Sequence, residues 1–263
     1  MRRIASSMTI GWIAVAAALS LPSGCAFLRT PDTNVPSVTV AAKSAANKKM
    51  VIVLPGAMDN LKSLQRSGID AVIQRYMPEA DVVLIALSMS YYLEGRGMER
   101  LHEQVVVPAR QAGYREIYLA GASLGGMGVL KYESEHPGEM TGLILMSPYM
   151  GETSLVEEIK AAGGLSEWKP QSKPTELRFD GATPDEWRVV KSLSTNRTRA
   201  SHVWLVCGQQ DRYYGASQLI AEVLPPGNYI GLSGAHTWSV WTVGAGKVFE
   251  QIGHGYPRSA AVR

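Results

Sequence analysis

The stretch Ile117-Tyr-Leu-Ala-Gly-Ala-Ser-Leu-Gly-Gly126 decides the fold, because an apolar run leads directly into a serine surrounded by glycines. The β-branched, aromatic and aliphatic residues at its start favour a strand, which Gly121 interrupts. A helix is expected to begin at Gly126, directly after the serine segment. The stretch therefore predicts a strand, a sharp turn at Ser123 and a helix.

Strand candidates alternate with longer segments along the rest of the chain. Six are expected, at 50–54, 81–87, 115–120, 141–146, 202–207 and 227–232. Helical periodicity marks 61–76 and 101–109, although Pro108 should break or kink the second helix. Apolar strands that alternate with helices predict a mainly parallel sheet covered on both faces, and therefore an α/β fold.

Composition is consistent with one globular domain of this class. The chain has 263 residues, of which 46% are hydrophobic and 19% charged, enough to bury a full core. Two domains are the less favoured alternative. The formal net charge is +3, and without the first 24 residues it is 24 basic minus 23 acidic, or +1. Such a balance does not indicate a nucleic acid as a partner.

The N-terminus is typical of a targeting segment. Arg2 and Arg3 precede an uncharged run at 10–21, which is short for a membrane span but suits the core of a signal peptide. Residues 1–24 are therefore interpreted as a signal peptide and excluded from the folded domain.

The end of this segment, Leu21-Pro-Ser-Gly-Cys25, resembles the lipobox of bacterial lipoproteins. The resemblance implies that Cys25 is lipidated and anchors the protein to a membrane. Ala26 gives no aspartate retention signal, which implies the outer membrane. Pro22 departs from the pattern, because the usual leucine lies three residues before the cysteine. The alternative is an ordinary secretory signal that leaves Cys25 as a free thiol.

Three further segments are delimited by composition. Residues 25–48 are expected to form a tether with a short strand at 38–41, and 256–263 a flexible tail. The α/β domain is assigned to 49–255, with an inserted cap at about 150–200. Cys207 lies in an apolar stretch and is expected to be a buried thiol, not the partner of Cys25 in a disulfide.

Gly121-Ala-Ser123-Leu-Gly125 matches the G-x-S-x-G pattern of a nucleophile elbow. In such an elbow the serine occupies a strained turn, and small residues two positions before and after it let helix and strand approach. The glycines are thus predicted to be steric clearances. The alternative is a glycine-rich turn with an incidental serine.

With this motif the chain resembles the α/β-hydrolase superfamily, which implies an acid after a later strand and a histidine after the last one. Asp211 follows the strand candidate at 202–207 in Cys207-Gly-Gln-Gln-Asp211. His236 follows the last strand candidate and precedes a helix expected at 239–252. Ser123, Asp211 and His236 therefore occur in the required order.

Other residues compete for the acid and base roles. The acid alternatives are Asp180, Asp185 and Glu222, which fall in the insertion or on a helix. The other histidines are His102, His136, His202 and His254, none of which lies in the loop after the last strand. Asp211 and His236 are preferred for their positions.

The chemistry implied is acyl transfer. His236 would take the proton of Ser123 and return it to the leaving group, while Asp211 would orient and stabilise the imidazole. In the superfamily one oxyanion donor is the backbone of the residue after the nucleophile, here Leu124.

The second oxyanion donor is expected in Leu54-Pro-Gly56-Ala-Met, where Pro55 replaces the usual histidine. Ala57 is preferred, and Met58 is the alternative because the register is one residue uncertain. A plain strand-to-helix turn capped by Asp59 fits the same residues.

The insertion is expected to carry short helices near 154–161 and 183–191. Apolar side chains there and after the second strand would line an acyl pocket or simply pack the cap: Met150, Leu155, Trp168, Trp187, Tyr91 and Tyr92.

No metal, nucleotide or other cofactor is expected. His102-Glu103 lacks a partner at ligand spacing, and the glycine-rich stretch 121–128 lacks the lysine of a phosphate loop. The sequence therefore predicts a cell-envelope serine hydrolase acting on small-molecule acyl esters. The alternatives are an amidase, peptidase or thioesterase, or a non-catalytic lipoprotein that binds acyl ligands on a hydrolase scaffold.

Overall fold

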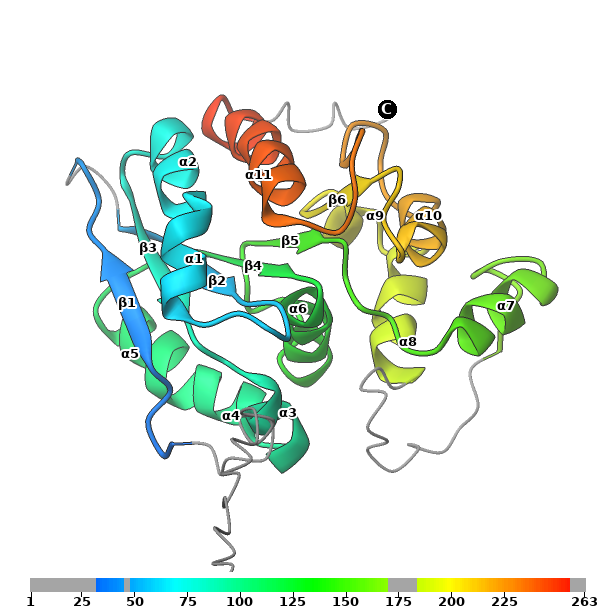
Figure 1. Ribbon diagram of the computed structural model, residues 1–263, viewed down its shortest axis with the longest axis horizontal. Coiled ribbons are helices and arrows are strands. Elements are labelled where there is room, and N and C mark those ends of the chain that lie inside the picture. Colours follow the sequence, from blue (N-terminus) through cyan, green and yellow to red (C-terminus); the bar gives the residue numbers. More distant parts are fainter. Residues whose placement is uncertain (1–31, 45–47, 170–183, 256–263) are drawn as a thin grey trace, which may run out of the picture.

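A computed structural model describes residues 32–44, 48–169 and 184–255, and in this part of the chain seven strands form one sheet (Figure 1). The strands are β1 Ser37–Val40, β2 Lys49–Leu54, β3 Ala80–Ile85, β4 Glu116–Ala122, β5 Gly142–Met146, β6 Val203–Gly208 and β7 Tyr229–Leu232. Their spatial order is β1-β3-β2-β4-β5-β6-β7. Only β1 is antiparallel to its neighbour, so the prediction of a mainly parallel sheet is confirmed.

Helices cover both faces of this sheet. They are α1 Leu61–Ser67, α2 Ile69–Tyr76, α3 Met89–Glu94, α4 Gly97–Leu101, the π-helical turn η2 His102–Val106, α5 Val107–Gln111, α6 Leu124–Glu135, α7 Thr153–Ala161, α8 Pro184–Leu193, α9 Arg197–Ala200, α10 Tyr214–Ala221 and α11 Trp238–Gly253. None of these described helices is both long enough and apolar enough to cross a bilayer.

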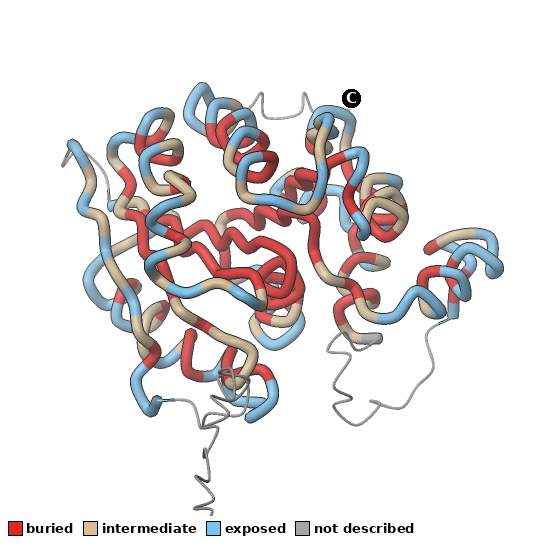
Figure 2. The backbone as a smooth tube through the Cα atoms, viewed as in Figure 1, coloured by how far each residue is buried: buried red, intermediate tan, exposed pale blue. Residues whose placement is uncertain are grey.

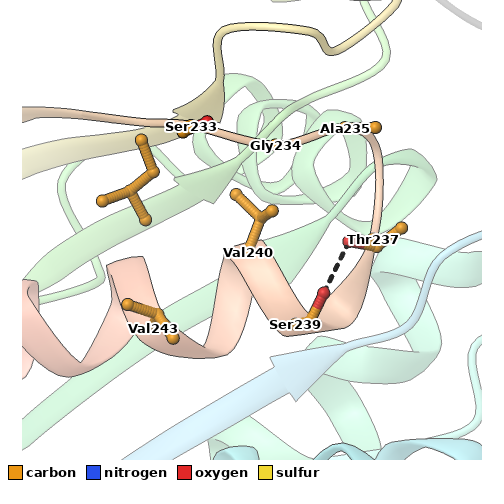
Figure 3. A pocket seen from close by; sticks show the side chains of 8 residues that line it. Ser233, Gly234, Ala235, Thr237, Ser239, Val240 and Val243 are labelled. Atoms are coloured by element: carbon orange, nitrogen blue, oxygen red, sulfur yellow. Dashed lines mark hydrogen bonds between the residues drawn. The ribbon is translucent and has the colours of Figure 1, made fainter.

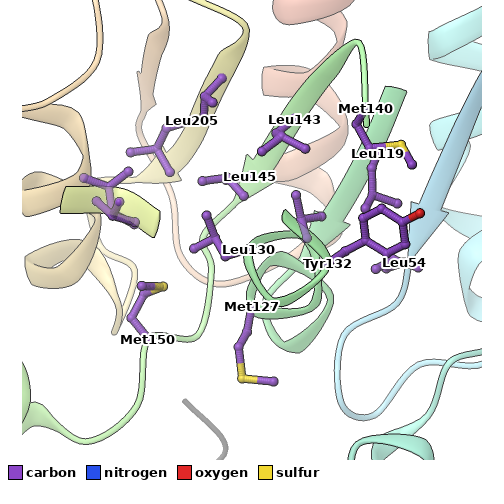
Figure 4. Packing of buried hydrophobic residues seen from close by; sticks show 14 of the residues in the cluster. Leu54, Leu119, Met127, Leu130, Tyr132, Met140, Leu143, Leu145, Met150 and Leu205 are labelled. Atoms are coloured by element: carbon purple, nitrogen blue, oxygen red, sulfur yellow. The ribbon is translucent and has the colours of Figure 1, made fainter. Parts of the chain in front are cut away.

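Alternating side chains of the strands build two cores. Val51 and Val53 of β2 face α1, α2 and α11, whereas Ile52 and Leu54 face the side of α4 to α6. Figure 2 shows the central strands and α6 buried along most of their length, and Figure 4 shows the second core from close by. Because successive strand residues point to opposite faces, a sheet covered on both sides needs apolar residues at every position.

Two helical expectations need correction. The helix expected over 61–76 is split into α1 and α2 at Gly68, whose φ of 69° ends the first helix and begins the second. The helix expected over 101–109 does not end at Pro108. The π-helical turn widens the backbone, with the Val107 amide donating to the His102 carbonyl, so that a residue without an N–H continues the helix.

The segment expected as a tether belongs in part to the folded body. β1 pairs with β3 at the edge of the sheet, close to the strand predicted at 38–41. The Val35 amide donates to Gln104 Oε1 at 2.9 Å, and Arg100 donates to the Asp32 carbonyl. Residues from Asp32 to Val40 therefore pack on the domain.

Candidate active site

Ser123 occupies the turn between β4 and α6, where the strand and helix predictions meet. Its φ of 53° lies in the left-handed region, which a residue with a Cβ adopts only at a cost of about 1–3 kcal/mol. Four backbone hydrogen bonds hold it: the Ser123 amide donates to the Met146 carbonyl, and its own carbonyl accepts from Gly126, Met127 and Tyr149. The strained backbone is that of a nucleophile elbow.

The glycines around Ser123 are required by backbone approach. A Cβ added at Gly121 would lie 2.1 Å from the Gly125 carbonyl oxygen. At Gly125 it would lie 2.6 Å from the carbonyl oxygens of Leu54 and Pro55. All of these contacts are with main-chain atoms, which a side-chain rotation does not relieve. The expectation that the glycines are steric clearances matches this geometry.

The three residues proposed from sequence order converge at the carboxyl edge of the sheet. His236 Nε2 lies 2.9 Å from Ser123 Oγ, and His236 Nδ1 lies 2.9 and 2.8 Å from the two carboxylate oxygens of Asp211. A carboxylate accepts from the protonated nitrogen, so Nδ1 carries the hydrogen and Nε2 faces the serine as an acceptor. This is the arrangement that nucleophilic catalysis by serine needs.

Asp211 is held as a buried carboxylate, with its side chain fully shielded. Burial raises the pKa of Asp211. Hydrogen bonds from His236, from the Tyr213 amide at 2.8 Å and from the Ser147 hydroxyl together outweigh burial and hold the pKa below its ordinary value. The acid therefore stays ionised and can stabilise an imidazolium.

Ser147 is a part of the site that the sequence analysis missed. It follows β5, is fully buried and has a φ of 44°. Its hydroxyl accepts from Trp241 Nε1 at 2.9 Å and donates to Asp211. Only its backbone conformation distinguishes Ser147, and the sequence does not show that conformation.

Two aromatic rings enclose the imidazole. Trp241 and Tyr213 both meet the His236 ring edge to face, at centroid distances of 4.6 and 4.9 Å. Tyr149, whose ring is 5.5 Å from that of Tyr213, extends this wall. The rings keep the imidazole in one orientation and leave 14% of its side chain exposed.

The expected oxyanion loop lies beside the nucleophile. A Cβ built at Gly56 would be 3.7 Å from Ser123 Cβ, so the loop after β2 passes beside the nucleophile. Leu124 is the first residue of α6, so its amide lies at the positive end of that helix. The oxyanion roles of Ala57, Met58 and Leu124 stay predictions.

Asp59 does not cap the following helix, as the plain-turn alternative would have it. The N-cap of α1 is Asn60, which exchanges hydrogen bonds with Ser63. Asp59 instead accepts from the Gly56 amide at 3.0 Å, from Ser63 Oγ at 2.8 Å and from Trp238 Nε1 at 2.8 Å. It therefore joins the oxyanion loop to the first residue of α11, two positions after His236.

The competing residues lie elsewhere. Asp185 pairs with Arg188 on α8, and Glu222 ends α10. His202 contacts the Thr198 carbonyl and His254 ends α11, while His102 and His136 stack on each other at the far end of α6.

The side chains suggested as an acyl pocket mostly pack the interior. Trp187 is fully buried and donates to the Met150 carbonyl at 3.0 Å, and Trp168 donates to Glu158 at 2.8 Å. Tyr91, Tyr92 and Met150 are buried as well. For these five residues the packing alternative describes the structure, while Leu155 is half-buried.

A shallow hollow of about 390 Å³ borders the loop that carries His236. Figure 3 shows Val240 and Val243 on one side of it and Ser233 to Ala235 on the other, with Thr237 and Ser239 hydrogen-bonded at 2.9 Å. Cys25, Asp180 and the tail at 256–263 lie outside the described residues.

Sequence comparison gives a partial match. Residues 98–204 match the model of a family described as serine aminopeptidase, S33. The matched range includes Ser123, ends before Asp211 and His236, and covers less than half of the chain. A search of curated proteins gives no match.

Solved structures match over most of the chain. Est1E from Butyrivibrio proteoclasticus has a TM-score of 0.52 at 19% identity, over 83% of this chain and 92% of its own. The fluorophosphonate-binding serine hydrolase FphF of Staphylococcus aureus has a TM-score of 0.55 at 12% identity, over 84% and 99%. The S-formylglutathione hydrolase FrmB of Staphylococcus aureus has a TM-score of 0.53 at 11% identity, over 86% and 99%. At these identities the likeness shows the fold alone, and that fold is the α/β-hydrolase fold.

Proposed function

We propose that the protein is a serine hydrolase that cleaves acyl esters through an acyl-enzyme on Ser123. The hydrogen-bonded row from Asp211 through His236 to Ser123 is the observation that carries the proposal. A serine hydroxyl is a weak nucleophile at neutral pH, and a neutral imidazole within hydrogen-bond reach is what activates it.

The reaction has two halves. Ser123 Oγ attacks the ester carbonyl while its proton moves to His236 Nε2, and the imidazolium then protonates the departing alcohol. Water enters, gives a proton to His236 and attacks the acyl carbon, and Ser123 leaves with that proton. In both halves Asp211 holds Nδ1–H and stabilises the transient positive charge.

The negative charge on the carbonyl oxygen needs donors fixed in advance. The Leu124 amide at the start of α6 and the Ala57 amide, or Met58 in the alternative register, are the donors we propose. Each such donor contributes on the order of 10²-fold or more to the rate, because it is already oriented when the charge develops.

Esters are favoured over amides by the structural neighbours. They include a ferulic acid esterase and an S-formylglutathione hydrolase. The matched family model is described as a serine aminopeptidase and supports the amide alternative. The second candidate is therefore an amidase or peptidase on the same three residues.

Matched substrates separate these candidates. One acyl group, offered as an unactivated ethyl ester, an ethyl thioester and an N-ethyl amide, should be released from the ester and not measurably from the amide. Ser123→Ala should lower the rate by about 10⁴-fold or more and abolish labelling by a fluorophosphonate probe. If the amide is turned over, the amidase assignment replaces ours.

A non-catalytic scaffold that binds acyl ligands is the remaining alternative. It predicts no covalent labelling of the wild type and the same fatty acid affinity in Ser123→Ala as in the wild type. Labelling of the wild type that is lost in Ser123→Ala would exclude it.

For the cellular location we propose a lipid anchor on Cys25 in the cell envelope. The lipobox-like Leu21-Pro-Ser-Gly-Cys25 supports this proposal. In a bacterial host, radiolabelled palmitate should enter the wild type but not Cys25→Ser, and the wild type should fractionate with outer membranes. A secreted, unlabelled wild type would contradict the anchor.

A further inference from the structure

Three side chains of metal-binding types meet at the end of α6 that lies away from Ser123. His102 belongs to η2, His136 is the C-cap of α6, and Glu139 follows in the loop to β5. Their ligand atoms lie within 4.8 Å of one another. We propose that His102, His136 and Glu139 form a binding site for a divalent transition-metal ion of the Zn²⁺ type.

The spacing suits tetrahedral coordination. Bonds of 2.0–2.1 Å to zinc place neighbouring ligand atoms about 3.4 Å apart. His102 Nδ1 is already 3.3 Å from Glu139 Oε2, and His136 Nδ1 is 4.0 Å from the same oxygen. His136 Nδ1 must therefore move roughly half an ångström closer to the Glu139 oxygen.

That approach is a rotation of His136. The two imidazole rings stack with centroids 4.1 Å apart and planes 9° from parallel, so both Nδ1 atoms face Glu139. Parallel rings cannot direct both in-plane lone pairs at a single ion, and one ring must turn out of the stack. About a quarter of each side chain is exposed, which leaves room for the turn on the solvent side.

The carboxylate is held from behind by a buried phenol. The Tyr132 ring is fully buried in the core under the sheet, among Leu54, Leu119 and Met140 (Figure 4). Its hydroxyl lies 2.5 Å from Glu139 Oε2 and 2.9 Å from His102 Nδ1. The hydroxyl donates its one hydrogen to the Glu139 carboxylate and accepts from His102, so a bound ion would take the place of the hydrogen on His102 Nδ1. Hydrogen bonds of this kind orient metal ligands.

The local charge favours a cation. Carbonyl groups at the C-terminal end of α6 carry its partial negative charge. Glu139 adds a full one, and neutral imidazoles add none. Arg110 donates to the backbone carbonyls of Tyr114, Arg115 and Glu139, and none of these hydrogen bonds involves the Glu139 carboxylate. A bound ion would connect the segment from α4 to α5 with the C-terminal end of α6.

Titration of Zn²⁺ into protein that carries no histidine tag and has been stripped with a chelator tests the site. Calorimetry should show one ion bound per chain. His102→Ala and Glu139→Gln should each weaken binding at least about tenfold, and Tyr132→Phe by about tenfold through the lost support. His202→Ala and His236→Ala are controls and should bind as the wild type does.

A wild type that binds no ion, or binds it as tightly as His102→Ala and Glu139→Gln do, would overturn the proposal. Loss of binding in His236→Ala would do the same, because it would place the ion at the triad. Replacement of zinc by Co²⁺ should give the intense visible absorption of a tetrahedral ion. Far-ultraviolet circular dichroism in the presence of chelator identifies any variant that has not folded. If one of the two ligand variants is unfolded, the zinc affinity of the other tests the proposal.

Discussion

The nucleophile and its base are held by different means. Ser123 is fixed by main-chain contacts, since β4, α6 and the loop after β2 approach one another where Gly121 and Gly125 leave no room for a side chain. His236 is fixed by side chains, namely Asp211 below it and two aromatic rings around it. A substitution in the elbow should therefore disrupt all of its main-chain contacts together, whereas the side-chain contacts of His236 can be removed one at a time.

Gly125→Ala should have the largest effect. The added Cβ would overlap the carbonyl oxygens of Leu54 and Pro55. We expect a loss of roughly 3 kcal/mol or more in the free energy of unfolding, together with the activity. Gly215→Ala, on α10, is the matched control, because its nearest heavy atom is the end of a lysine at 3.6 Å. Urea unfolding measures both, and equal stability of the two variants would contradict a backbone-held elbow.

Asp211→Asn tests the strongest contact that holds His236 in place. An amide can reverse the tautomer of His236, so that Nε2 carries the hydrogen and no longer accepts from Ser123. We expect kcat to fall by about 10⁴-fold, as for other triads, with KM little changed. Ester turnover measures it, and a decrease below tenfold would mean that another group orients His236.

Asp59→Ala should have an intermediate effect, because it releases both the oxyanion loop and Trp238. The expected decrease in kcat is about 10- to 100-fold, less than for a lost oxyanion donor. Asp59→Asn should recover most of it, since an amide oxygen still accepts from Gly56 and Trp238. Trp238→Phe breaks only the contact with α11 and should cost less than Asp59→Ala.

Ser147→Ala should reduce kcat by about tenfold, because one hydrogen bond to a buried carboxylate contributes on the order of 1.5 kcal/mol. Trp241→Phe should resemble it, because the indole acts on Asp211 through the same hydroxyl. If the two losses add in the double variant, the indole and the hydroxyl act separately.

The smallest effect concerns acid stability. A carboxyl whose pKa is lowered on folding stabilises the fold above its unfolded pKa, and this contribution is lost as the pH falls through its folded pKa. The stability advantage of the wild type over Asp211→Asn should thus be present at neutral pH. It should shrink once the pH is below the ordinary value of 3.8. Urea unfolding at neutral pH and at about pH 3 compares them.

The sequence predicts features that depend on neighbouring residues and misses those that depend on backbone angles or distant contacts. All six strands and the order of Ser123, Asp211 and His236 are found, because apolar strands and close-approach glycines leave marks in the local sequence. The division of the helix at Gly68 depends on the positive φ of that glycine, and a glycine in a sequence does not by itself show a positive φ. The Asp59 to Trp238 contact joins residues 179 positions apart, and no local pattern carries it.

The proposed metal site could not be predicted for the same reason. The sequence offers His102 no partner at ligand spacing, because His136 lies 34 positions further on. His102 lies in the π-helical turn before Pro108, where the sequence predicts only that the proline breaks or kinks the helix.

The direction of β1 has a consequence for how the molecule would stand on a surface. Ser37 pairs with Ile85, the last residue of β3, so the chain joins the sheet at the edge where Ser123 and His236 lie. Six residues separate Cys25 from Asp32, a reach of at most about 25 Å when fully extended. Attachment through Cys25 would therefore keep the start of the folded domain within this distance of the bilayer.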